Sequence, residues 1–515
     1  MSATSEEDIA EHVLATAPER LHTVIDRACL ETPDRPAVSD DRVSWTYGQL
    51  DAVVTDMSLA LRDQGLRPGD RLMIIGENCN EVAALIFAAS RSSAWAIVVN
   101  PRMSSREIAQ IRSHSCARLA VFAARSSKEA AMHAEEAEAR FCSTGPFAGL
   151  SLAAVDETVA AEPVFEDGAK QVAVLIYTSG TTGTPKGVML SHQNLLYSAG
   201  VTSAVRGITA VDRIYGVLPV SHIVGISLLV MTFQNGASIR LSSKFDPAAL
   251  IAAVSDEGVT MLSGVPATYQ RVLEYMASIR LQHLDAGKLR FTGVSGAPLD
   301  INLKRRVEAV FGLPLLNGFG ITECSPGISG VRIGAPRDDV SVGKLLPGIE
   351  ARIVATKTDD GGDTGELHVR GPNVMLGYYK SPEQTSAVVD QDGWFNTGDL
   401  ARFAEDALFV VGRTKEMIIR SGFNVYPAEV EAVLSSHPDV VQCAVVGRRT
   451  EDNEDVVAFV QFLAGSTLGI EQLAEHARSR LTAYKRPTEI IAMASLPATS
   501  TGKILKHKLA ETLRA

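Results

Sequence analysis

The chain has 515 residues, of which 46% are hydrophobic, 21% charged and 6% aromatic, a composition typical of a globular protein. This length exceeds what one hydrophobic core normally supports, so we expect two or more domains. The formal net charge of -11 argues against a nucleic-acid partner bound through a general basic field. Six cysteines without a C-x-x-C pair fit neither a disulfide framework nor a thiolate zinc site, and they indicate a reducing, cytoplasmic setting.

The N-terminus gives no sign of a targeting segment. Residues 1–11 are acidic and lack the basic-then-apolar order of a secretory signal. The longest apolar stretch, residues 223–233, is too short to span a bilayer and has the length of a buried core element. We therefore expect a soluble protein without a membrane span.

The first two-thirds of the chain predicts an α/β body. Short apolar runs at residues 71–76 and 94–100 are typical of buried strands, and residues 104–112 carry a helical pattern. Strands that alternate with helices in this way favour βαβ units and a parallel sheet. From Gly348 the character changes, because residues 349–355 and 365–371 predict two short strands set close together. This region is expected to form a smaller β-rich unit.

The last hundred residues predict a separate α+β domain. A Ser, Pro and Gln pattern at residues 381–384 marks a helix start ahead of it. Residues 426–434 then predict a helix and residues 440–446 a strand. We place the boundary at about Lys415, which divides the chain into an N-terminal domain, residues 1–414, and a small mobile C-terminal domain, residues 415–515.

A glycine- and hydroxyl-rich loop is the strongest chemical signal. The strand predicted at residues 172–177 runs directly into residues 178–187, of which three are Gly and five are hydroxylic. Backbone N–H groups approach an anion closely at glycines, hydroxyls donate to phosphate oxygens, and Lys186 adds a positive charge. The loop is not a Walker motif, because Pro185 precedes Lys186 and Gly187 follows it. The loop therefore predicts polyphosphate binding, against the alternative of a plain flexible linker.

At this loop the chain resembles the adenylate-forming superfamily, which contains acyl-CoA and aryl-CoA ligases, adenylation domains and firefly-type luciferases. Five further motifs of that family follow in the same order, at residues 293–298, 317–323, 394–399, 412–415 and 497–503. The resemblance implies an ATP-dependent enzyme that activates a carboxylic acid as an acyl-adenylate. The acyl group then passes to a thiol, most simply that of coenzyme A.

The resemblance also implies nucleotide-binding residues. Asp399 and Arg413 are similar to residues that hydrogen-bond the ribose hydroxyls, an acceptor and a donor suited to a diol. We expect the phosphate loop to contain Thr178, Ser179, Gly180, Thr181, Thr182 and Lys186. We expect the adenine slot to be formed by Gly296, Ala297, Pro298, Asn317, Gly318, Phe319 and Gly320.

Three residues carry the chemistry that the resemblance implies. Thr322 matches a hydroxyl that binds the α-phosphate, and Glu323 matches the carboxylate that holds Mg²⁺, a cation that prefers oxygen ligands. Lys503 matches the family's catalytic lysine, which bridges the acid and the α-phosphate and stabilises charge in the transition state. No protein nucleophile is required, so the lack of a G-x-S-x-G elbow is expected.

The second step is expected to involve a domain movement. Lys415 falls at the family's hinge position, and Gly422 lies where a backbone turn contacts pantetheine. The stretch at residues 418–427 resembles CoA ligases more than amino-acid adenylation domains. Plant coumarate ligases and luciferases carry Lys where this chain has Ile419 and Ser421. This chain therefore departs from the family pattern at residues expected to contact the thiol substrate.

The identity of the acid depends on the segment around His222. Its Pro-x-x-His spacing matches the family's gate to the acid pocket, with the alternative of a core histidine. The segment lacks the Asp that holds an amino-acid ammonium, so an aromatic or medium-chain apolar acid is favoured. A dicarboxylate needs a second basic anchor, and because Arg271 could be that anchor, a malonate-like acid also stays open. Three competing functions also stay open: an acyl-AMP ligase for a carrier protein, a luciferase-like oxidase and a non-catalytic nucleotide-binding protein.

Overall fold

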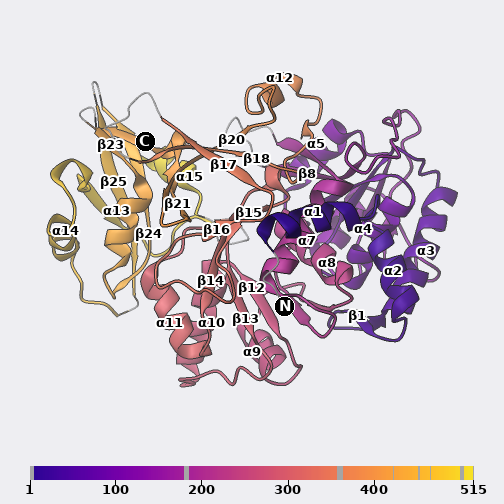
Figure 1. Ribbon diagram of the computed structural model, residues 1–515, viewed down its shortest axis with the longest axis horizontal. Coiled ribbons are helices and arrows are strands. Elements are labelled where there is room, and N and C mark those ends of the chain that lie inside the picture. The colour runs from indigo at the N-terminus through magenta and orange to yellow at the C-terminus, as the bar shows by residue number, and fades with distance from the viewer. Residues whose placement is uncertain are drawn as a thin grey trace.

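The computed structural model describes residues 5–178, 185–355, 363–420, 423–450, 453–463, 465–498 and 504–513. In these residues two large sheets form the body, with helices between them and on both outer faces (Figure 1). A four-stranded sheet and a smaller α+β unit follow towards the C-terminus. The α/β fold class predicted from the sequence is confirmed.

The first large sheet has nine strands in the order β16-β15-β14-β13-β12-β10-β11-β1-β2. The strands β10 to β14 are parallel, so their carboxyl ends share one edge, where open α/β sheets bind ligands. The bounds are β1 (Pro36–Ser39), β2 (Ser44–Thr46), β10 (Arg213–Gly216), β11 (Ser238–Leu241), β12 (Met261–Gly264), β13 (Phe291–Val294), β14 (Leu315–Gly320), β15 (Gly327–Gly330) and β16 (Lys344–Leu345).

The second large sheet has eight strands in the order β19-β9-β8-β4-β3-β5-β7-β6. Every residue of β3 and β4 is buried, as the two apolar runs predicted, because helices cover both faces of this sheet. The bounds are β3 (Arg71–Ile75), β4 (Trp95–Val99), β5 (Leu119–Phe122), β6 (Arg140–Phe141), β7 (Ser151–Leu152), β8 (Val172–Thr178), β9 (Lys186–Ser191) and β19 (Gly377–Tyr378).

Helices fill three layers around the sheets. The main core joins both sheets through a central layer, whereas separate cores lie under the two outer layers. The central layer contains α2 (Thr23–Glu31), α3 (Tyr47–Asp63), α4 (Asn80–Arg91), α7 (His192–Arg206) and α8 (Ile223–Gln234), with α1 (Glu6–Thr16) against α7. The outer layers contain α5 (Ser105–Ser115) and α6 (Lys128–Glu136) on one side, and α9 (Pro247–Ser255), α10 (Pro266–Ser278) and α11 (Ile301–Phe311) on the other.

The β-rich unit is an antiparallel sheet in the order β17-β18-β20-β21. Its elements are β17 (Glu350–Val354), β18 (Gly365–Arg370), β20 (Phe395–Ala404) and β21 (Ala407–Arg413), with the short helix α12 (Pro382–Ser386) between β18 and β20. The strands predicted at residues 349–355 and 365–371 are therefore confirmed.

The C-terminal unit has its own apolar core, which includes Val430, Val445 and Leu473. The proposed domain boundary at Lys415 falls in the 3₁₀ turn η2 (Thr414–Glu416), just before this unit. The elements are β22 (Ile418–Arg420), β23 (Phe423–Val425), α13 (Pro427–Ser435), β24 (Val440–Arg449), β25 (Glu454–Phe462), α14 (Ile470–Arg478), η3 (Ala483–Lys485), β26 (Glu489–Ala492) and α15 (Lys506–Thr512).

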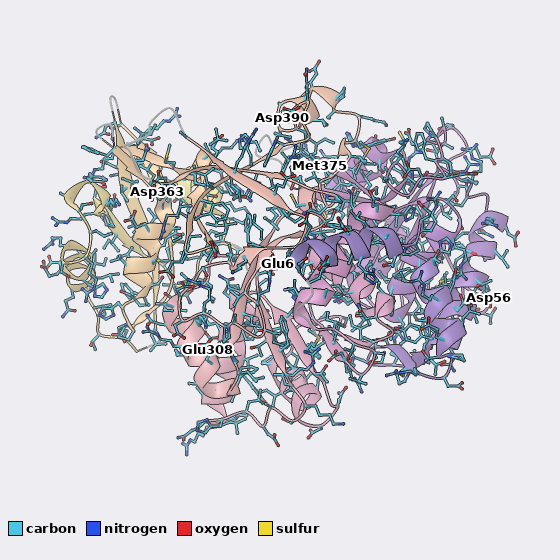
Figure 2. All side chains as sticks on the ribbon, viewed as in Figure 1. Glu6, Asp56, Glu308, Asp363, Met375 and Asp390 are labelled. Atoms are coloured by element: carbon cyan, nitrogen blue, oxygen red, sulfur yellow. The ribbon has the colours of Figure 1, made fainter. Side chains whose placement is uncertain are left out.

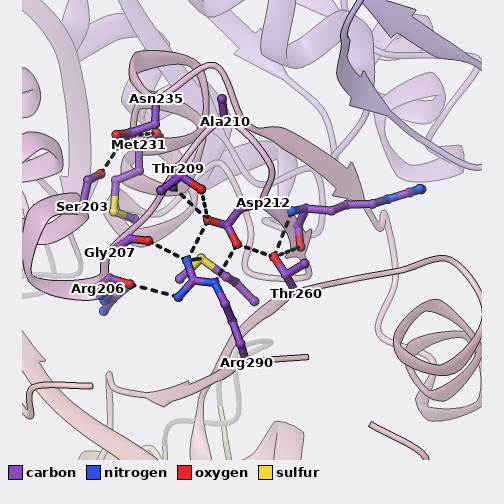
Figure 3. Close-up of polar contacts among 12 residues, drawn as sticks. Ser203, Arg206, Gly207, Thr209, Ala210, Asp212, Met231, Asn235, Thr260 and Arg290 are labelled. Atoms are coloured by element: carbon purple, nitrogen blue, oxygen red, sulfur yellow. Dashed lines mark hydrogen bonds and ion pairs between the residues drawn. The ribbon is translucent and has the colours of Figure 1, made fainter. Parts of the chain in front are cut away.

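A buried carboxylate joins the amino ends of the parallel strands, at the edge opposite the carboxyl ends (Figure 3). Asp212 precedes β10 and accepts hydrogen bonds from Arg290 Nη2 at 2.7 Å and from Thr260 Oγ1 at 2.7 Å. Arg290 also donates to the backbone oxygen of Gly207, which follows α7. The cluster thus ties α7 to the starts of three neighbouring strands and positions their far ends, where the candidate site lies.

In the residues that the model describes, no helix is long and apolar enough to cross a membrane. The stretch at residues 223–233 forms most of α8, and ten residues of that helix are buried in the body.

Candidate active site

The predicted phosphate loop connects two strands of a hairpin. β8 and β9 pair antiparallel, and Thr178 and Lys186 are the last partners before the connection. The loop residues Ser179, Gly180, Thr181 and Thr182 lie outside the described residues. The hairpin therefore fixes both ends of the loop, with Lys186 at one of them.

Lys186 belongs to a cluster that the sequence did not reveal. Its Nζ lies 4.7 Å from the centre of the Tyr378 ring, within cation–π range. The Tyr378 hydroxyl donates a hydrogen bond of 3.0 Å to Glu323 Oε1. Burial and the neighbouring Glu323 carboxylate raise the pKa of Tyr378, so the hydroxyl keeps its proton and remains a donor. One tyrosine thus joins the lysine of the phosphate loop to the predicted metal ligand.

Backbone pairing explains how Tyr378 reaches this place. β19 pairs antiparallel with β9, with Tyr378 opposite Val188 in the hairpin. Met375, labelled in Figure 2, donates its backbone N–H to the Glu323 carbonyl at 2.8 Å. Thr322 and Glu323 form the 3₁₀ turn η1 (Thr322–Cys324) after β14. The only sequence signal for Tyr378 was a Gly-Tyr-Tyr run, which does not indicate a partner almost two hundred residues away.

We predict that Tyr378→Phe lowers the rate of adenylate formation about 10-fold at limiting Mg²⁺, because partners of metal-binding side chains typically contribute 10- to 100-fold. The phenylalanine ring keeps the contact with Lys186 and loses only the hydrogen bond to Glu323. Acid-dependent pyrophosphate release, measured against Mg²⁺ concentration, checks this. Tyr379→Phe is the matched control, because its hydroxyl donates instead to Glu162 at 2.5 Å. An unchanged Mg²⁺ dependence in Tyr378→Phe would contradict the prediction.

The residues assigned to the adenine slot come from two neighbouring parallel strands. Val294 of β13 and Asn317 of β14 are register partners, so the loop after β13 and the end of β14 lie side by side. Gly296 has φ +83, a conformation that glycine adopts without strain, and it is exposed. Its loop neighbours are Ala297, half-buried, and Pro298, exposed; Gly318, Phe319 and Gly320, at the end of β14, are half-buried.

Local hydrogen bonds fix the Asn317 side chain. Its Nδ2 donates to the Val340 carbonyl at 2.9 Å, and its Oδ1 accepts from the Gly318 backbone N–H at 3.0 Å. Asn317 is buried. Both bonds hold the Asn317 side chain and the end of β14 in place, and one N–H of the side-chain amide is left over.

The two residues assigned to the ribose contact each other. Asp399 of β20 and Arg413 of β21 are register partners, and Arg413 Nε lies 3.0 Å from Asp399 Oδ1. The Asp399 side chain is buried, whereas 46% of the Arg413 side chain is exposed. Burial and the charges of Glu323 and Asp399 raise the pKa of the Cys324 thiol well above its usual range. The predicted metal and ribose carboxylates thus both help to keep the Cys324 thiol protonated.

The predicted gate residue His222 is the N-cap of α8. Its ring is exposed, yet the surrounding protein displaces bulk water and lowers its pKa. An exposed His222 does not fit the alternative of a core histidine, and its role as the gate stays a prediction. The low pKa keeps the imidazole neutral at pH 7.

Two further residues hold the segment that carries His222. Asn78 donates to the carbonyls of Gly216 and Leu218 at 3.0 and 2.9 Å, and accepts from the Val220 N–H at 2.8 Å. A Cβ on Gly225 would lie 2.2 Å from the Pro219 carbonyl oxygen, so only glycine allows this approach of α8. Asn78 was missed from the sequence because it lies in a different part of the chain.

The remaining candidates lie towards the C-terminus or on the surface. Lys415 is exposed in η2, two residues after Arg413. Arg271 is exposed on α10, where its guanidinium lies 5.3 Å from the centre of the Phe245 ring. Gly422 and Lys503 lie outside the described residues. Of the predicted phosphate and metal residues, the structure thus brings Lys186 and Glu323 to one tyrosine, Tyr378.

The chain matches known proteins over most of its length. Residues 25–379 match the AMP-binding enzyme family, and residues 429–503 match the C-terminal domain of AMP-binding enzymes. It is 32% identical to a feruloyl-CoA synthase of Amycolatopsis, over 93% of this chain and 96% of the relative. It is 34% identical to an indoleacetate–CoA ligase of Aromatoleum aromaticum, over 94% of this chain and 96% of the relative.

Solved structures agree with these relatives. ATP-bound MatB from Rhodopseudomonas palustris superposes with a TM-score of 0.83 and 28% identity, over 95% of this chain and 98% of that one. The o-succinylbenzoate CoA synthetase MenE from Bacillus subtilis, in complex with its acyl-adenylate, superposes with a TM-score of 0.78 and 26% identity, over 94% of this chain and 97% of that one.

The fold and the site define an adenylate-forming enzyme. The chain belongs to the AMP-binding enzyme family, and it is an AMP-forming ligase that joins a carboxylic acid to coenzyme A with ATP and Mg²⁺. The family resemblance and the class of reaction predicted from the sequence are confirmed.

Proposed function

We propose that the enzyme converts an aromatic carboxylic acid, of the benzoate or cinnamate type, first to an acyl-adenylate and then to its CoA thioester. The observation that carries this proposal is the contact chain from Lys186 through Tyr378 to Glu323. In it one tyrosine contacts both Lys186, next to the predicted phosphate loop, and Glu323, the carboxylate predicted to bind the metal. Lys186 and a Mg²⁺ ion held by Glu323 would together neutralise the charge of the ATP phosphates.

In the first step the carboxylate of the acid attacks the α-phosphate of ATP and pyrophosphate leaves. Glu323 would hold Mg²⁺, which neutralises phosphate charge when bound, and Thr322 would donate to the α-phosphate. Lys503 would bridge the acid carboxylate and the α-phosphate. Asp399 and Arg413 would hold the ribose, and the loops that contain Gly296 and Gly318 would hold the adenine.

In the second step the thiol of CoA attacks the acyl carbon and AMP leaves. We assign the boundary of the moving C-terminal domain, residues 415–515, to Lys415, which is exposed between β21 and β22. Once the C-terminal domain has moved and Lys503 has left the site, Gly422 would contact the pantetheine arm of CoA. A hinge needs only a few residues that tolerate a change in φ and ψ.

An aromatic acid is favoured by apolar surface near the predicted site residues and by the relatives. Val224, Phe319 and Ile321 are partly buried and pack against the main core, so each offers apolar surface near predicted site residues. Several relatives are named for aromatic acids, including feruloyl-CoA synthase, 4-coumarate–CoA ligase and indoleacetate–CoA ligase. Medium-chain and malonate-type acids are the competing substrates, and a carrier protein is the competing acceptor.

The cytoplasm is the proposed compartment. All six cysteines are free thiols, as expected where thiols are kept reduced. Both ATP and CoA are consumed by the reaction, so the enzyme needs a compartment that supplies them.

Pyrophosphate release with ATP, Mg²⁺ and a panel of acids tests the proposal. The panel contains benzoates, cinnamates, fatty acids and malonate, each with and without CoA. We expect release that depends on an aromatic acid, with a CoA thioester as the product. Preference for a fatty acid or malonate would contradict the substrate class. Acid-dependent release that CoA does not stimulate would point to another acceptor, such as a carrier protein or an amine.

A further inference from the structure

A half-buried lysine follows the predicted catalytic lysine by three residues. Lys506 begins α15, and its Nζ lies 2.9 Å from Glu431 Oε1 and 3.0 Å from Glu416 Oε2. Only 22% of the Lys506 side chain is exposed. Most lysines are exposed to solvent, whereas Lys506 lies between two carboxylates.

The two carboxylates come from different parts of the C-terminal unit. Glu416 belongs to η2 and directly follows Lys415, the predicted hinge. Glu431 lies on α13, is 15% exposed, and also accepts the Val445 backbone N–H at 2.7 Å. Lys506 therefore connects the start of α15 to the hinge turn, to α13 and, through Glu431, to β24.

Backbone contacts join the residues that precede and follow positions 499–503 in the sequence. Ala498 and Ile504 form an antiparallel bridge, and the Leu505 N–H donates to the Pro497 carbonyl at 2.8 Å. Leu509 is buried against the core that includes Val446 and Phe459. The described residues before and after this stretch are thus paired with each other, and Lys506 makes its ion pairs two residues after Ile504.

The charge of this contact persists at neutral pH. Burial alone would lower the pKa of Lys506, but Glu431 and Glu416 outweigh burial and raise it. The ammonium therefore stays protonated near pH 7.

We propose that Lys506 is a positioning residue for acyl-adenylate formation. By binding Glu416 and Glu431 it ties the start of α15, three residues after Lys503 in the sequence, to the hinge turn. When the hinge turns, the start of α15 turns with it as one body. A displacement of about 1 Å in a catalytic group can cost about 100-fold in rate. The inference rests on the proposed function through the role of Lys503.

The test separates the two half-reactions. Adenylation is measured as acid-dependent ATP–pyrophosphate exchange, and thioester formation as the reaction of a synthetic acyl-adenylate with CoA. We expect Lys506→Met to lower adenylation about 10- to 100-fold and to leave thioester formation within about twofold of wild type. Lys506→Arg should restore most of the adenylation, because a guanidinium also binds two carboxylates.

Lys508→Met is the matched control. Lys508 is exposed, has the same charge, and lies on the same helix two residues further on, so this variant should behave as wild type in both half-reactions. Equal losses in both half-reactions of Lys506→Met, or no loss, would overturn the inference. If Lys503→Ala keeps adenylation, the role of Lys503 itself fails, which is a different result from a failure of Lys506.

Discussion

Replacing Lys503 with alanine is expected to lower acyl-adenylate formation by about 100-fold or more, because a group that stabilises transition-state charge typically contributes this much. The loss should appear in the first half-reaction, since in the proposed mechanism Lys503 has left the site when CoA attacks. Thioester formation from a supplied acyl-adenylate should remain within about twofold of wild type. Single-turnover measurements of each half-reaction check the prediction.

The matched control for Lys503→Ala is Lys508→Ala, an exposed lysine five residues further on. A parallel loss in both half-reactions of Lys503→Ala would contradict the assignment, since it would indicate a folding defect or a role in both steps. Unchanged adenylation would place the first-step cation elsewhere, and Lys186 would then be the next candidate.

Replacing Asp212 with alanine is expected to lower the free energy of unfolding by about 3 kcal/mol, a cost typical of breaking a buried ion pair. The Asp212 side chain is 1% exposed and accepts from Arg290, Thr260 and the Thr209 N–H. Its removal leaves these donors without their acceptor (Figure 3). Denaturant titration of both proteins measures the difference.

The Asp212 effect should depend on pH. Burial alone would raise the pKa of Asp212, but hydrogen bonds from Arg290, Thr209 and Thr260 outweigh burial and lower it. A carboxyl whose pKa is lowered by folding stabilises the protein above its unfolded pKa, and this contribution is lost as pH falls through the folded value. The difference between wild type and Asp212→Ala should therefore be full near pH 7 and shrink below about pH 4.

Asp338→Ala is the surface control for this experiment. Asp338 is exposed, so its replacement should change the free energy of unfolding by less than about 0.5 kcal/mol. A loss in Asp212→Ala no larger than in Asp338→Ala, or one that does not change with pH, would contradict a structural role for the Asp212 cluster.

The sequence determined the class of the protein because its motifs are local. A loop such as residues 178–187 has its chemistry in adjacent residues, and a buried parallel strand such as β3 is a continuous apolar run. Both signals survive without knowledge of the fold. The α/β class, the β-rich unit and the family were therefore all predictable.

Only the tertiary structure decided which residues meet. Tyr378 reaches Glu323 and Lys186 because β19 pairs with β9, and Lys506 reaches Glu416 and Glu431 because α15 packs on β24. These contacts join residues up to almost two hundred positions apart, and strand pairing of this kind leaves no periodic trace in either segment. Sequence patterns report the environment of one element, whereas a site is made by the register between elements.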